Sequence, residues 1–296
     1  MKSRLRAAFF MGIALLAQSL SRLISQANEE VGFTMKLGVG RRLFVGLACA
    51  ALASCATGPI ETDASRIDVS PWAQASFNPP LPAAAAAGSG WQHLKFPGKT
   101  ATRFGYARKD GREAVAVSAN SSVSMMRKTV RVEPGDLGNV RFSWQVPELI
   151  ADADMLSRDA DDSPVRIVLA FEGDRSKFSQ RNALLSELSR TLTGEEMPYA
   201  TLMYVWCNKR APGTVLSSPR TDRIRKIVVE SGALKLGKWL DYERDIAADF
   251  RRAFGESPGA LVGIGIMTDT DNTRSTVQAW YGPVRVGQSS IRPANQ

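Results

Sequence analysis

Cysteine and histidine are scarce in this chain of 296 residues, which contains three cysteines and one histidine. Cys49 lies within an apolar segment near the start and Cys55 directly follows it, so Cys207 alone remains for the rest of the chain. Intramolecular disulfides are therefore excluded from the main body, and its fold has to rest on an apolar core. With His93 as the sole imidazole, neither zinc coordination by Cys/His spacing nor a Cys–His nucleophile is expected.

Motifs for nucleotide and serine chemistry are also missing. The sequence has no phosphate-binding P-loop, no dinucleotide glycine fingerprint and no Gly-x-Ser-x-Gly setting. The net charge of +9 does not indicate nucleic acid, since residues 1–54 hold seven basic and only two acidic side chains. Later basic residues are interspersed with acids, and those of 220–226 alternate like the outer face of a strand. No nucleic-acid partner is expected.

The segment before Cys55 has the pattern of an export signal. Residues 35–55 begin with basic side chains, continue with a short apolar run and end in small residues, which is typical of a secretory signal rather than a permanent transmembrane helix. The ending Leu52-Ala-Ser-Cys55 resembles the lipobox of bacterial lipoproteins, in which the chain is cut before a lipidated cysteine. Ordinary signal cleavage beside an incidental cysteine is the alternative.

The lipobox resemblance implies a location. Lipid (diacylglycerol and palmitate) on Cys55 would tether the protein to a membrane, and Ala56 after it would direct it to the outer membrane, facing the periplasm. Residues 1–54 are then leader, and Met35 is the expected start of translation because residues 1–34 contain a second signal-like start.

Beyond the anchor, composition divides the chain into three parts. Residues 55–90 are rich in Pro, Ala, Ser and Gly and are interpreted as a tether. Within it, Trp72 and Phe77 could pack back against the domain that follows. Residues 91–287 form the expected domain, and residues 288–296 a flexible tail. Segments of period-two or β-branched character fill this domain; they are 91–96, 102–108, 114–119, 124–132, 140–146, 165–171, 200–206, 224–230, 261–268 and 277–286.

Two helical patterns interrupt these segments. Residues 176–192 place Phe178, Leu184, Leu185 and Leu188 near one side, and residues 245–254 repeat apolar side chains every four residues before a glycine. A parallel α/β fold would need helices between most strands. The predicted fold is therefore mainly β, an antiparallel, jelly-roll-like β-sandwich with two short helical insertions.

The domain resembles a known family. The motifs Tyr204-Val-Trp-Cys-Asn208 and Ala279-Trp-Tyr-Gly282, together with residues 161–171, 239–255 and 267–273, are similar to the bacterial family called domain of unknown function 3047. This similarity extends from about Trp91 to Val286, and the family name implies no activity. The general pattern also resembles jelly-roll carbohydrate-binding modules, which implies a ligand across one sheet.

Two acidic clusters are the candidate ligand or metal residues. They comprise Asp161 and Asp162 before one strand, and Asp269, Asp271 and Asn272 after another. Such oxygen-rich loops can hold Ca²⁺, but the EF-hand pattern is missing, and Asp and Asn also build plain turns by bonding their own backbone. If the clusters meet, their carboxylates need Arg166, Arg244 or a metal to relieve repulsion.

These acids also leave a catalytic alternative open. A glycosidase needs two carboxyl groups about 5–5.5 Å or 6.5–9.5 Å apart, and Asp162, Asp269, Asp271 and Glu172 are its candidate members. Exposed acids at strand ends are common, so a non-catalytic domain is the leading hypothesis.

Trp280 and Tyr281 are the candidate aromatic contacts for sugars. Being adjacent, they point to opposite faces of a strand, so only one of them can line an outer surface. The leading hypothesis is a lipid-anchored β-sandwich of the cell envelope that binds a glycan or another envelope component. The alternatives are an envelope glycan hydrolase with an acidic pair and a structural lipoprotein that binds a protein partner. No cofactor is expected apart from the Ca²⁺ alternative.

Overall fold

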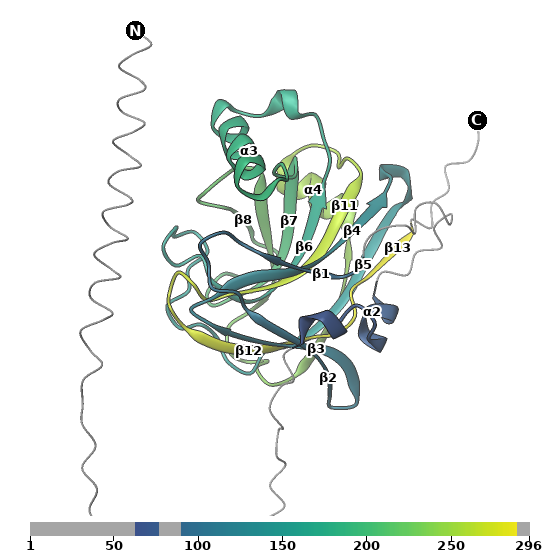
Figure 1. The fold of residues 1–296 in the computed structure, drawn as a ribbon, viewed down its shortest axis with the longest axis vertical. Helices are drawn as coiled ribbons and strands as arrows, with labels where there is room; N and C mark the ends of the chain where they lie inside the picture. The colour runs from purple at the N-terminus through teal and green to yellow at the C-terminus, as the bar shows by residue number, and fades with distance from the viewer. Residues whose placement is uncertain (1–62, 77–89, 289–296) are drawn as a thin grey trace, which may run out of the picture. The chain divides into compact units, whose positions relative to one another are not determined.

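The computed structural model describes residues 63–76 and 90–288 (Figure 1). The leader, Cys55 and most of the predicted tether, including Phe77, lie outside the described residues. Export and lipidation of Cys55 therefore stay predictions. None of the helices within the described ranges combines the length and the apolar character that a membrane span requires.

The domain consists of two sheets. In spatial order, the seven-stranded sheet contains β1 (Gln92–Lys95), β4 (Val123–Val132), β11 (Leu261–Asp269), β6 (Ser163–Phe171), β7 (Ala200–Cys207), β9 (Ile224–Ser231) and β8 (Val215–Ser217). The six-stranded sheet contains β10 (Trp239–Asp245), β5 (Leu137–Gln145), β12 (Thr276–Tyr281), β3 (Arg112–Asn120) and β2 (Arg103–Lys109), with β13 (Arg285–Gln288) pairing β5. Only β7 and β9 pair in parallel among these strands. The prediction of a mainly β sandwich is confirmed.

Strand alternation builds the core between the sheets. On β6, Ile167 and Leu169 are fully buried in the main apolar cluster, whereas Val168 belongs to a separate cluster on the outer side of the same sheet. The second sheet contributes Tyr281 and Trp144, both fully buried, to the main cluster. Successive side chains thus face the core and the outer surface in turn.

Both predicted helices are present. The helix α3 (Gln180–Thr193) begins after the N-cap Ser179 and ends at Gly194, which adopts the left-handed conformation with a φ of 78°. The helix α4 (Ile246–Phe254) is capped by Asp245 and buries Ile246 and Phe250. The apolar side of α3 does not face the core, because Leu184, Leu188 and Leu192 are exposed while Asn182 and Ser186 are buried.

Residues 63–76, assigned from composition to the tether, pack against the domain. The short helix α2 (Pro71–Ala75) carries Trp72, which is fully buried and lies 4.7 Å from Trp91 between ring centroids. Ile67 is equally buried in the main cluster. The folded unit therefore begins before Trp91, because two bulky side chains inside the Pro/Ala-rich segment complete its core.

Three further features were not expected from the sequence. The strands β8 and β10 were not predicted, and β10 is the edge of its sheet with every second residue exposed. The segment 277–286, predicted as one strand, divides into β12 and β13 at Pro283. Proline cannot donate to the ladder, so regular pairing stops there.

Candidate functional site

The two acidic clusters meet in space. Asp269 ends β11, Asp271 lies in the turn after it, and Asp161 and Asp162 precede β6, which pairs with β11. The Asn272 side-chain amide donates to Asp162 Oδ1 at 2.8 Å, joining the two clusters directly. Sequence alone left open whether they lie together.

Asp161 belongs to a buried ion cluster on the outer side of the seven-stranded sheet. Lys226 Nζ lies 2.5 Å from its Oδ1, and Arg166 Nη2 donates to the Asp161 carbonyl oxygen at 2.6 Å. Burial, followed by the neighbouring Arg166 charge, lowers the pKa of Lys226 to about 8. Arg244, the other predicted counter-charge, lies elsewhere and pairs with Asp249 at 2.6 Å.

Asp162 organises the turn after β11. Its Oδ2 accepts hydrogen bonds from the Thr273 backbone N–H at 2.7 Å and the Thr273 hydroxyl at 2.6 Å. Burial acts to raise the pKa of Asp162, but these hydrogen bonds and that of Asn272 hold it below its usual value. The Asp162 carboxylate is therefore charged and rigidly oriented.

Asp269 is the least compensated of the four carboxylates. Its Oδ2 accepts from Arg166 Nη2 at 3.2 Å, whereas its buried Oδ1 has no hydrogen-bond partner. Burial raises the pKa of Asp269 well above its usual value, although Arg166 opposes this shift, and Asp271 and Asp162 add to it. One carboxylate oxygen from each of Asp162, Asp269 and Asp271 lies within 4.8 Å of the other two.

This geometry does not suit a hydrolytic acid pair. Asp162 and Asp269 are each 6% exposed or less, the Asp271 side chain is 11% exposed and pairs with Lys99, and none of the three lines either of the two cavities described below. Glu172 lies apart from them and pairs with Arg131 at 3.0 Å. A glycosidase needs two carboxyl groups that face a substrate across a cleft.

Tyr281 is too deeply buried to be one of the aromatic contacts for a sugar. Its ring is fully buried between the sheets, so no ligand on an outer surface can reach it. Trp280 points to the opposite side and is half-buried on the outer face of the six-stranded sheet. Gln145 lies directly opposite Trp280 on one side and opposite Trp239 on the other, which sets two indole rings in one row across three strands.

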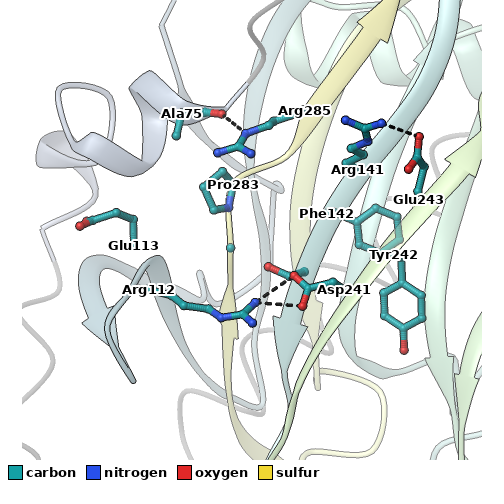
Figure 2. A pocket seen from close by; sticks show the side chains of 12 residues that line it. Ala75, Arg112, Glu113, Arg141, Phe142, Asp241, Tyr242, Glu243, Pro283 and Arg285 are labelled. Carbon is teal, nitrogen blue, oxygen red and sulfur yellow. Dashed lines mark hydrogen bonds and ion pairs between the residues drawn. The ribbon is translucent and has the colours of Figure 1, made fainter.

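Cations cover both rings of this row. Lys109 Nζ lies 5.0 Å from the Trp280 ring centroid, and the Arg112 guanidinium lies 5.3 Å from that of Trp239. Beside the row is a pocket of about 520 Å³, in which Figure 2 shows Arg112 paired with Asp241 and Arg141 paired with Glu243. Six of its twelve lining residues are charged, and four of these six form the two ion pairs.

A larger groove of about 1080 Å³ lies on the outer face of the seven-stranded sheet. Residues of six strands line it, and its floor is mainly apolar; among the floor residues are Met125, Val168, Ala170, Met203, Ile224 and Met267. The α3 helix contributes Ser189 and Thr193 to one wall.

Glycine keeps the floor of this groove open. Gly263 lines the groove from β11, which pairs with β4 on one side and β6 on the other. At Gly265 the Met125 side chain already fills the space, since an added Cβ atom would lie 2.7 Å from the Met125 Sδ atom. A Cβ atom on Gly263 would make only ordinary contact, 3.5 Å from the Ala170 Cβ atom, so nothing but the missing side chain leaves this space free. Glycine inside a strand can mark close approach of a ligand, so Gly263 is the signal of this groove that the sequence itself carries.

Paired charges form the rims of the groove. Arg127 holds Glu195 with two hydrogen bonds of 2.6 and 2.9 Å, and Arg175 pairs with Glu196 at 3.2 Å. Arg131 and Glu172 line the rim in the same way. The groove thus combines an apolar floor with walls that can donate and accept hydrogen bonds.

Comparisons with known proteins find one family. The model of the family described as "Protein of unknown function (DUF3047)" matches residues 89–285. No curated protein matches the chain.

Solved structures that the chain matches at low TM-score include the following two. The xyloglucanase domain of NopAA, a type three effector from Sinorhizobium fredii in complex with cellobiose, has 8% identity and a TM-score of 0.37, covering 68% of this chain and 94% of that one. SGBP-B from a complex xyloglucan utilization locus in Bacteroides uniformis has 10% identity and a TM-score of 0.25, covering 68% of this chain and 46% of that one. At such low identity and TM-score, neither likeness tells what this chain binds.

Proposed function

The chain belongs to the DUF3047 family of unknown function, and we propose that its domain is a non-catalytic binding protein of the cell envelope that holds a glycan chain in the outer-face groove. The observation that carries this proposal is the groove of about 1080 Å³ itself, with its mainly apolar floor and hydrogen-bonding rims. Concave, mostly apolar sites with a few well-placed polar groups are the usual form of a binding site.

The division of polarity in the groove suits a glycan. A pyranose ring has apolar C–H faces and hydroxyl groups at its edges. The methionines of the floor, such as Met203 and Met267, offer adaptable apolar contact to the faces. The Arg127–Glu195 and Arg175–Glu196 pairs stand at the edges, where their remaining donors and acceptors can bond hydroxyl groups.

The absence of catalysis is part of the proposal. On the described strands, the floor of the groove carries no carboxylate. Its rim acids are held in ion pairs with arginines; they are Glu133, Glu172, Glu195 and Glu196. The hydrogen bond from Arg127 lowers the pKa of Glu195 below its usual value, whereas hydrolysis of a glycoside requires a protonated acid. If the protein is a hydrolase after all, Asp162→Asn or Asp271→Asn would lower a measurable turnover.

The envelope location is proposed from residues 35–55 alone. Lipid on Cys55 would hold the domain at a membrane, and Ala56 is in keeping with the outer membrane and a periplasmic orientation. Envelope polysaccharides are the glycans that a domain so anchored would meet.

The test is to fill the groove from its floor. Binding of purified envelope polysaccharides is measured by affinity electrophoresis or calorimetry for the original protein, for Gly263→Leu and for the control Gly287→Leu. Gly263 lines the groove, whereas Gly287 is exposed on β13 of the other sheet, where an added Cβ atom would lie 3.6 Å from the Asn139 carbonyl oxygen. Gly263→Leu should weaken binding at least tenfold, about 1.4 kcal/mol, and the control should not.

A second surface for the same function is the row of Trp239, Gln145 and Trp280. Indole rings stack on sugar faces, but Lys109 and Arg112 would first have to leave these rings. Trp280→Ala separates the two surfaces. Loss of binding in Trp280→Ala together with full binding in Gly263→Leu would assign the site to the six-stranded sheet. Failure of the original protein to bind any envelope polymer would refute the proposal that it binds a glycan.

A further inference from the structure

Asp162, Asp269 and Asp271 converge where the turn after β11 meets the loop before β6. The three carboxylates each offer an oxygen within 4.8 Å of the other two. Ligand oxygens around one calcium ion lie at about 2.3–2.6 Å from it, and hence up to about 5 Å from each other. The spacing therefore fits a single central cation.

A second observation concerns Asp269 Oδ1. This oxygen is buried, belongs to a residue that is only 6% exposed and has no hydrogen-bond partner. Leaving a buried carboxylate oxygen unpaired is costly, so native structures provide a partner in nearly every case. A bound cation would satisfy this oxygen, and a proton on the carboxyl group would be the competing solution.

The protein's own cations do not fill this position. Arg166 Nη2 faces the other oxygen of Asp269, and Lys226 faces Asp161. Lys99 pairs with Asp271 Oδ2 from a side chain that is 43% exposed. Each of these three positive groups therefore pairs with an acid oxygen other than Asp269 Oδ1.

The surroundings hold the ligands in place. The Thr273 backbone N–H and hydroxyl fix Asp162 Oδ2, and the Asn272 amide joins Asp162 to the turn. Hydrogen bonds of this kind, made to the ligands rather than to the ion, orient the carboxylates of metal sites. An all-oxygen set of this kind suits Ca²⁺, which takes oxygen ligands in flexible geometry.

We propose that Asp162, Asp269 and Asp271 form a calcium-binding site. The ion would clamp the turn after β11 to the loop before β6. Met267, two residues before Asp269, lines the outer-face groove, so the clamp would also stabilise one end of that groove. The site does not depend on the glycan proposal, since its ligands lie outside the lining of the groove.

The experiment uses the full chain, stripped of metal with a chelator, and titrates Ca²⁺ by calorimetry and by thermal unfolding. We expect one saturable site, and at a hundredfold excess over Kd a rise in Tm of roughly 5–10 °C. Asp269→Asn and Asp271→Asn should each abolish both signals. Asp159→Asn, an exposed acid in the same loop as Asp162, is the matched control and should keep them.

If Asp269→Asn does not fold, the Asp271→Asn variant decides the outcome. Asp271 is less buried and its pair with Lys99 is partly exposed, so its substitution should disturb the fold less. No heat and no rise in Tm at millimolar Ca²⁺ would overturn the proposal and assign a proton to Asp269 instead. A rise in Tm that persists unchanged in Asp271→Asn would also overturn it, since the ion would then bind elsewhere.

Discussion

The Tyr281 hydroxyl donates a hydrogen bond of 2.6 Å to the carbonyl oxygen of Met267, although the two residues belong to different sheets. The same hydroxyl accepts the backbone N–H of Arg166 at 3.2 Å. The ladder between β6 and β11 shifts register just after Met267. One phenol from the facing sheet thus satisfies two backbone groups at the point where regular pairing fails.

Tyr281→Phe should reveal this role as a loss of stability. The variant keeps the ring in the core but leaves the Met267 carbonyl and the Arg166 N–H without the hydroxyl, which we expect to cost about 1–3 kcal/mol. Urea unfolding measures this change. Tyr106→Phe is the control, because the Tyr106 hydroxyl bonds to Glu113 on a half-exposed hairpin. Equal stability of both variants would contradict the bridging role.

Arg166→Ala should be far more destabilising than a surface arginine variant. Arg166 is 3% exposed and pairs with Asp161 and Asp269, so its removal leaves buried carboxylates short of a partner. Breaking such a buried pair costs about 3–5 kcal/mol. Arg112→Ala, which breaks a pair with exposed Asp241, should cost less than about 1 kcal/mol. Both values come from denaturant midpoints, and comparable losses would argue against the buried cluster.

His93, the only histidine, should make the fold sensitive to acid. Burial, and then the charge of Lys95, lowers the pKa of His93 below its usual 6.5. The unfolded chain therefore binds a proton more readily, and stability falls as the pH drops from 6.5 through the folded pKa. The single imidazole resonance in NMR gives this pKa directly. Lys95→Gln should raise it, and a value at or above 6.5 in the original protein would refute the prediction.

The anchor prediction is tested on the intact protein. Expressed in a Gram-negative host, the chain should be recovered from membranes with an amino terminus at Cys55 and a mass increased by acyl groups. Cys55→Ser should remove the added mass and the membrane association. Cys49→Ser is the matched control, because Cys49 lies within the apolar part of the leader. An unmodified Cys55 would contradict the lipid anchor.

Local patterns in the sequence were enough to predict most of the fold. Period-two or β-branched character along residues 165–171 predicted β6, and Gly194 and Gly255 predicted the helix ends that the structure confirms for α3 and α4. The start of α3 was predicted at residue 176, whereas the helix begins after the N-cap Ser179. These signals act between residues close in the chain, so no tertiary contact is needed to recognise them. The strand β8, only three residues long, and the edge strand β10 lacked such a signal.

Only the tertiary structure decided where the acids meet and which surfaces are open. Asp162 and Asp269 are brought together because β6 and β11 are neighbours in the sheet, and strand order is set by packing of the whole core. The same packing buried Tyr281, left Trp280 half-exposed beside Trp239, and turned Gly263 toward the groove. Residue types in the sequence were sufficient to propose oxygen ligands and aromatic contacts. Which residues lie beside them depends on contacts between segments far apart in the chain, and these contacts are set by the packing of the entire fold.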